Sequence, residues 1–159
     1  MQTQTQVNEP VAADLAEFSD LLRQRGLLEA MRLLNARTSH RYTGVFRFDG
    51  EMLRCVALVD KWDASVTCRD DVPLDKAYCA HLHRTGEAVR VDYGPTDARF
   101  PWMQQSPFVS YCGAVISDPH GEHWGALCHF DVARCEALGA ELALVVGAAS
   151  VLYPSVVAI

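Results

Sequence analysis

The sequence predicts an α+β fold: a mainly antiparallel sheet of five to six strands between two layers of helices and loops, a three-layer α/β/α sandwich. Two β-hairpin patterns, in residues 42–59 and 109–131, supply most of the strands, and helical patterns at both ends of the chain supply one covering layer. The two halves of the second hairpin, Val109–Ser117 and His123–Asp131, contain consecutive apolar residues instead of an alternation. Strands of that kind are usually covered on both faces, so the sheet needs two covering layers.

The N-terminal part predicts a short tail and two helices. Residues 1–9 are polar, and we expect a disordered tail there, with residues 10–159 forming a single domain. Apolar residues three or four positions apart indicate a first helix from Pro10 to about Arg25 (Val11, Leu15, Phe18, Leu22). After Gly26, a second helix is expected from about Leu27 to Ser39.

The middle of the chain predicts a hairpin followed by irregular structure. Asp49-Gly50-Glu51 separates the β-rich segments Tyr42–Phe48 and Met52–Val59, which is a strong hairpin signal. Residues 60–76 are charged and irregular. Asp75 is the expected N-cap of a short helix over Lys76–Arg84, which Gly86 ends.

The remaining elements complete the sheet and its cover. A short strand is expected over Ala88–Asp92, and residues 93–108 hold three prolines and a glycine, which predicts a long loop with at most one helical turn. The second hairpin follows, and apolar spacing predicts a final helix over about Cys135–Tyr153.

Composition narrows the classes of partner. The net charge of −6 and the lack of a Lys/Arg run argue against binding to nucleic acid or to an anionic membrane. The first residues do not form a signal peptide, and no apolar stretch reaches the roughly 20 residues of a membrane span. Six cysteines without a secretion signal are expected to be reduced thiols, which predicts a cytoplasmic location.

Several short motifs, in this order, resemble one known family. Tyr78-Cys79 is followed by Thr85-Gly86, by Asp97-Ala98-Arg99-Phe100, and by a closing segment from Cys112 through Gly121 and Gly125 to Cys128 and Asp131. Each motif is weak alone, but their order and spacing over roughly residues 27–150 resemble a GAF domain. The resemblance implies a small-molecule sensing module with its ligand on the sheet face opposite the terminal helices.

The same resemblance places a pocket under two irregular segments. The expected lids are Lys61–Pro73 and Tyr93–Phe108, where aromatic residues, Phe108 among them, suit an apolar pocket. The candidate ligand-binding residues are Trp62, Cys79, Asp97, Arg99, Phe100, Trp102, Tyr111, Cys112 and Cys128. The alternative is that the aromatic residues anchor the loop onto the sheet and that Asp97 and Arg99 form a structural ion pair.

Other chemistries have weaker support. Cys79 and His83 are spaced for half of a zinc site on one helix face, but no CxxC or HExxH is present, so we assign no metal site. Cys79 is followed by Ala80 and not by the histidine usual at bilin attachment sites, and the Asn-Lys-Phe-Asp-Glu motif of cyclic-nucleotide GAF domains is missing. The GAF-fold reductase of free methionine-R-sulfoxide needs a nucleophilic and a resolving thiol, for which Cys79, Cys112 and Cys128 are candidates.

We therefore expect a non-catalytic, stand-alone sensory domain with no assigned catalytic residue, whose ligand the sequence does not identify. Its output would pass through a signalling partner or through a homodimer of the terminal helices. Two alternatives stay open: the thiol-dependent reductase, and a degenerate GAF interaction module whose pocket is filled by its own side chains.

Overall fold

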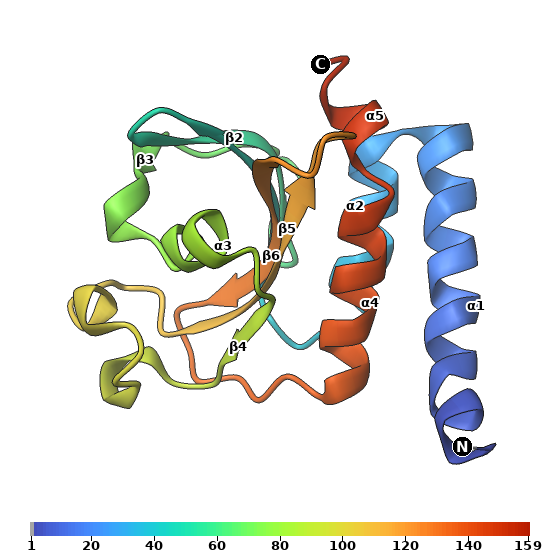
Figure 1. Cartoon of the computed structure of the whole chain (residues 1–159), viewed down its shortest axis with the longest axis horizontal. Helices are drawn as coiled ribbons and strands as arrows, with labels where there is room; N and C mark the ends of the chain where they lie inside the picture. The colour runs from blue at the N-terminus through green and yellow to red at the C-terminus, as the bar shows by residue number, and fades with distance from the viewer. Residues whose placement is uncertain (1) are drawn as a thin grey trace.

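The computed structural model describes residues 2–159, and side chains from residue 10 onward. Its centre is a six-stranded sheet with the strand order β3-β2-β1-β6-β5-β4 (Figure 1). Every neighbouring pair of strands is antiparallel, which confirms the predicted kind of sheet. The strands are β1 (Tyr42–Asp49), β2 (Met52–Asp60), β3 (Val72–Pro73), β4 (Val89–Val91), β5 (Ser110–Ser117) and β6 (His123–Asp131).

The two predicted hairpins are confirmed and lie side by side. β1 pairs with β2 up to Asp49 and Met52, and Gly50 between them has a φ of 59°, a conformation that glycine adopts without strain. The β5–β6 turn is held by Asp118, whose carboxylate accepts hydrogen bonds from the backbone N–H groups of His120 and Glu122. Since β1 also pairs with β6, both hairpins join into one continuous ladder.

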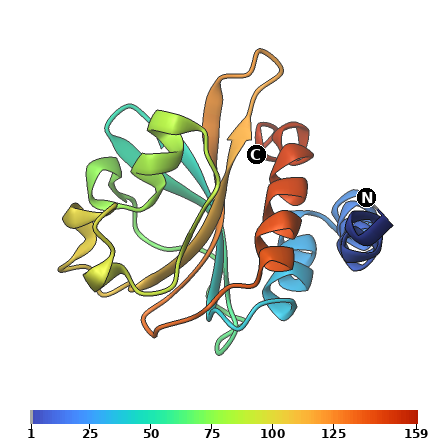
Figure 2. The ribbon, with the colours of Figure 1, turned by 60° about the horizontal axis from the view of Figure 1, so that its bottom comes forward.

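Helices cover one face of the sheet in two layers. α2 (Leu27–Ala36) packs on β1 and β2, and α4 (Gly139–Ser150) packs mainly on β5 and also on β6, followed by the short α5 (Tyr153–Val156). α1 (Gln2–Arg25) packs mainly against α2 and α4 and lies outside them (Figures 1 and 2). The expectation that both terminal helices lie on the sheet itself is thus corrected for α1. The reason is that α2 and α4 already cover the face, so the fully buried Phe18 of α1 enters the core that these helices share.

The opposite face is covered by short elements and loops. α3 (Cys79–Thr85) contacts β5 and β6, and it ends at Gly86, whose φ is 71°. Three single turns of 3-10 helix complete this layer, η1 (Leu74–Lys76), η2 (Gly94–Thr96) and η3 (Pro101–Met103). The long loop 93–108 therefore contains two such turns, one more than predicted.

Several boundaries differ from the predicted ones. α1 begins at Gln2, before Pro10, and so includes residues expected as a disordered tail; a proline removes one backbone hydrogen bond but does not prevent helix on its N-terminal side. The helix expected from Lys76 is divided, because Ala77 is extended between η1 and α3. The last helix begins at Gly139, four residues after Cys135, where the Glu141 carboxylate accepts the Leu138 N–H as a cap.

The sheet separates two apolar cores. Alternate strand residues face the helices or the loops, so Cys112, Ile116 and Leu127 belong to the helix-side core, while Tyr111, Cys128 and Phe130 belong to the loop-side core. None of the helices among the described residues combines the length and apolarity needed to cross a bilayer.

Candidate functional site

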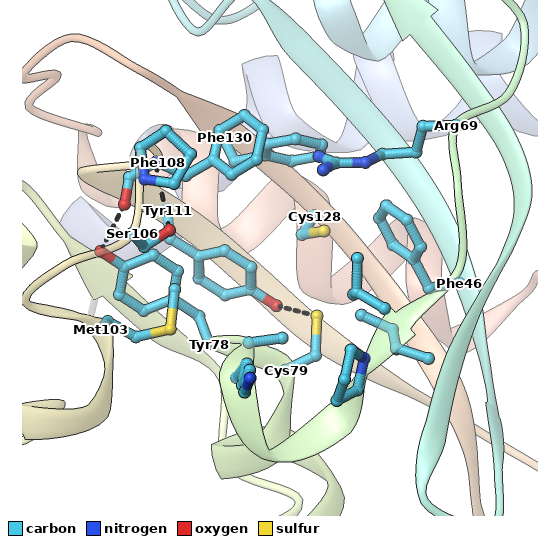
Figure 3. A pocket seen from close by; sticks show the side chains of 16 residues that line it. Phe46, Arg69, Tyr78, Cys79, Met103, Ser106, Phe108, Tyr111, Cys128 and Phe130 are labelled. Carbon is cyan, nitrogen blue, oxygen red and sulfur yellow. Dashed lines mark hydrogen bonds between the residues drawn. The ribbon is translucent and has the colours of Figure 1, made fainter.

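A cavity of about 240 Å³ lies between the loop-side face of the sheet and the segments that cover it. Figure 3 shows the side chains around it, which come from β1, β2, β5, β6, α3 and both irregular segments. Its sixteen lining residues are Phe46, Leu53, Arg69, Val72, Pro73, Lys76, Ala77, Tyr78, Cys79, Met103, Ser106, Pro107, Phe108, Tyr111, Cys128 and Phe130.

Tyr111 and Cys128 form the part of the floor that strand pairing positions. On β5 and β6, Gly113 pairs with Cys128 and Tyr111 with Phe130, so these side chains share the loop-side face. The Tyr111 side chain lies over Gly113: a Cβ at that glycine would be 2.4 Å from the Tyr111 hydroxyl oxygen. Glycine at position 113 therefore allows the tyrosine to lie flat on its own strand and reach Cys79.

Two thiols and a phenol meet at this floor. The Cys79 Sγ is 3.2 Å from the Tyr111 hydroxyl, and Figure 3 shows the Cys128 thiol beside them. Burial raises the pKa values of Tyr111 and of Cys128 well above their ordinary values. The pKa of Cys79 is lowered, because the Cys128 thiol and then the Tyr111 hydroxyl donate hydrogen bonds that stabilise its thiolate. Of the two thiols, Cys79 therefore ionises first.

Phe108 and Arg69 join the two covering segments at the mouth of the cavity. The Phe108 carbonyl accepts a hydrogen bond of 3.0 Å from the Tyr78 hydroxyl, and its N–H donates to the Ser106 hydroxyl. Its ring packs edge-on against Phe130, with 5.0 Å between the centroids. The Arg69 guanidinium lies 4.5 Å from the centre of the Phe108 ring, which is within cation–π range, so each lid contacts the other.

Three of the nine candidate residues line this cavity: Cys79, Tyr111 and Cys128. Cys112 lies on the helix side of β5, where burial raises the pKa of its thiol to about 12. Trp62 is 70% exposed and does not line the cavity; the Arg41 guanidinium lies 4.2 Å from the centre of the Trp62 ring.

The other candidates fasten the long loop. Asp97 and Arg99 form an ion pair of 2.7 Å, and Arg99 also donates to the Arg90 carbonyl on the neighbouring strand β4. The Arg99 side chain holds the pKa of Asp97 below its usual value. Phe100 is fully buried against Tyr78, while the Trp102 indole N–H donates to the Ala77 carbonyl. This arrangement corresponds to the anchoring alternative and to the structural ion pair.

Most of the lining was not among the candidates. Arg69, Lys76 and Tyr78 line the cavity, as do Met103 on the long loop and Phe130 on β6. Phe130 lies two residues after Cys128, so a period of two along β6 would have placed both on one face. No local signal identifies Arg69 or Lys76, because their segments are irregular and their direction depends on how the lids pack.

Cys79 and His83 do not share an environment. Cys79 is buried at the cavity, whereas His83 is exposed and packs edge-on against Phe48. Among the described residues, no three His, Cys, Asp or Glu side chains are grouped so as to hold a metal ion.

Comparison with known proteins identifies the fold through structure alone. No protein-family model and no curated protein sequence matches the chain. The GAF domain of a phosphoenolpyruvate-protein phosphotransferase from Acinetobacter superposes with a TM-score of 0.73 at 10% identity, over 94% of each chain. The free methionine-R-sulfoxide reductase of Neisseria meningitidis gives 0.72 at 13% identity, over 93% of this chain and 89% of the reductase.

A third similar structure is the chromophore-binding domain of phytochrome P1 from Stigmatella aurantiaca. Its TM-score is 0.71 at 12% identity, and the match covers 92% of this chain and 60% of the phytochrome chain. In this chain, a six-stranded antiparallel sheet has helices on one face and a loop-covered cavity on the other. Its strand order, its layers and these superpositions show that the chain has the fold of a GAF domain.

Proposed function

We propose that the chain is a non-catalytic sensory or regulatory GAF domain that binds a small molecule in the cavity between the sheet and the segments 61–73 and 93–108. The observation that supports this most directly is the cavity itself, which remains open although sixteen side chains surround it. A degenerate interaction module would have filled this space with its own side chains. The apolar lining with a few polar groups is typical of ligand sites.

The cavity volume limits the size of the ligand. A cavity of about 150 Å³ holds benzene. The 240 Å³ available here suits a fused ring system or a ring with a short substituent, and a larger ligand would extend out of the cavity or displace the lids. Because Arg69 and Phe108 connect the lids, a ligand that displaces either side chain would move both segments. That coupling is a physical route from binding to a signal.

Native mass spectrometry of the purified protein tests this function. We expect the wild type to carry or take up small molecules, and Ala77→Phe, which places a ring in the cavity, to lose them. Ala98→Phe is the matched control, since Ala98 is exposed on the long loop outside the cavity. Equal uptake by wild type and Ala77→Phe would contradict the proposal.

The output is proposed to pass through a homodimer or a signalling partner at the terminal helices. Residues 142–159 contain no charged side chain, and α4 is apolar nearly all round, with Val146 exposed beside the buried Val145. A helix with that composition is normally covered on every side. Equilibrium sedimentation should show a dimer at micromolar concentration that Val146→Glu dissociates; a wild type that is monomeric throughout would refute it.

A second candidate, the thiol-dependent reductase, is favoured by one observation: Cys79 and Cys128 face the same cavity. Two thiols can reduce a sulfoxide to the sulfide, forming one disulfide and one water. If the chain has this activity, Cys79→Ser and Cys128→Ser abolish reduction of free methionine sulfoxide while Cys112→Ser, on the helix side, retains it. Wild type without turnover would exclude this candidate.

A further inference from the structure

We infer that the ligand of this cavity is a flat aromatic molecule with an anionic head group, held by Arg69 and Lys76 at the mouth. This inference rests on the proposed function and names the ligand class of the same site. It depends on three features: the sign of the charges around the cavity, the unused hydrogen-bond donors of Arg69, and the aromatic walls.

The charges around the cavity are all positive, although the chain as a whole is acidic. Arg69 and Lys76 are its charged lining residues, and none of the carboxylates among residues 10–159 lines it. The acidic neighbours in the sequence do not line the cavity: Asp71 pairs with Arg54 at 2.7 Å, and Asp70 and Asp75 are exposed side chains outside the lining. In a site with low-dielectric walls, two unopposed cations favour an anion.

The Arg69 side chain is held by two aromatic rings, but no carboxylate among the described residues neutralises its charge. Its guanidinium lies over Phe108 at 4.5 Å and near Phe130 at 5.7 Å from the ring centres. Within the part of the chain whose side chains are described, it makes no ion pair and its N–H groups donate no side-chain hydrogen bond. Stacking uses the face of the guanidinium, so its in-plane N–H donors remain free to bind a carboxylate or phosphate with two parallel hydrogen bonds.

The body of the ligand is defined by rings. Four rings in the lining lie next to one another: Tyr78 and Tyr111 have 5.1 Å between their centroids, and Phe46 and Phe130 have 6.0 Å (Figure 3). Aromatic walls favour a planar ring by offset or edge-to-face contacts. The volume of 240 Å³ leaves room for a two-ring system beneath the cationic mouth.

The experiment compares two probes of the same shape, indole-3-acetate and indole-3-acetamide, by titration calorimetry. Wild type should bind the acid roughly tenfold more tightly than the amide, as expected for hydrogen bonds to a charged group. In the double variant Arg69→Gln/Lys76→Gln that preference should disappear while the amide affinity stays the same. Arg47→Gln, at an exposed arginine of β1 outside the cavity, should keep the wild-type preference.

Each other outcome overturns the inference. If the acid and the amide bind wild type equally, or if the preference survives in the double variant, the two cations do not select the ligand, and the cavity stays a binding site for neutral molecules. If octanoate binds as tightly as indole-3-acetate, the aromatic part is wrong. If neither indole binds at millimolar concentration, this ligand class is rejected, and the proposed function is then judged separately by the mass spectrometry of wild type against Ala77→Phe.

Discussion

Lowering the pH from 7 to 5 should destabilise this protein, although most carboxylates titrate only at lower pH. His129 should be a main cause of this loss. His129 lies on the helix side of β6 and is 2% exposed. Its Nδ1 is 2.7 Å from the Thr43 hydroxyl, which in turn accepts a hydrogen bond of 3.0 Å from the Asn35 side-chain amide. A neutral His129 protonated on Nε2 uses this chain fully, because Thr43 can then donate to Nδ1.

Burial lowers the pKa of His129 from 6.5 to about 3, with the His40 ring, stacked at 5.8 Å, and Lys61 adding to the effect. The unfolded chain therefore takes up a proton below pH 6.5 that the folded chain refuses until about pH 3, so stability falls as the pH falls through this window. The loss is about 1.4 kcal/mol for each pH unit, or about 2 kcal/mol between pH 7 and pH 5. Burial also lowers the pKa of His40, whose Nε2 has no partner among the described residues, and this adds a loss of the same sign.

The carboxylates act at lower pH. The pKa values of Asp49, Asp60 and Asp97 are lowered from 3.8 by hydrogen bonds from Arg54, Arg41 and Arg99. They therefore contribute stability that is lost as the pH falls through that lower range. Between pH 7 and pH 5, the loss of stability therefore reports on the histidines and not on these three carboxylates.

Urea unfolding followed by tryptophan fluorescence at pH 7, 6 and 5 measures this loss, each variant being compared with itself at pH 7. His129→Asn places an amide near Nδ1, where it can still bond to Thr43, and should reduce the loss between pH 7 and pH 5 by about 2 kcal/mol. His120→Asn, in the exposed β5–β6 turn, should behave as wild type. The same pH slope in wild type and His129→Asn would refute the reasoning.

Three further predictions concern single contacts. Gly86→Ala should destabilise the protein by about 2 kcal/mol in urea unfolding, since φ is 71° and the added Cβ would be 2.6 Å from His123 Nε2. Gly121→Ala, where φ is 82° and nothing lies near the added Cβ, should cost only about 1 kcal/mol, and equal losses would contradict the clash. Arg41→Met should destabilise the protein at neutral pH, because it leaves the Asp60 carboxylate, 4% exposed, without its charged partner. Since Arg41 holds the pKa of Asp60 below its usual value, the difference from wild type in urea unfolding should shrink as acid protonates Asp60, and a difference that does not change with pH would contradict this cause. Tyr111→Phe should slow the labelling of Cys79 by iodoacetamide at pH 8 severalfold, because the pKa of Cys79 rises without the hydroxyl donor. Mass spectrometry measures the labelling rate, and an unchanged rate would contradict the stabilisation of the Cys79 thiolate by Tyr111.

Local patterns predicted the fold well because they follow from backbone geometry. Asp49-Gly50 and the Asp118–Glu122 turn identify both hairpins, and Gly86 identifies the end of α3. The candidate site was predicted less completely. Aromatic loop residues can either line a pocket or anchor the loop, and composition does not distinguish these uses. The sequence therefore points to Phe100 and Trp102, which anchor the loop, and gives no signal for Arg69, which lines the cavity.

Periodicity and turn residues predict the antiparallel sheet, the helices at both ends and the two long covering segments, because these signals act over a few positions of the chain. Which face each strand residue uses depends on the packing of the whole sheet. The register of β5 against β6 turns Tyr111 and Cys128 toward the cavity and Cys112 toward the helices, and a shift of one residue would have exchanged them. The lids depend on contacts between segments far apart in the chain, such as Arg69 on Phe108, and these arise only when both segments pack on the same sheet.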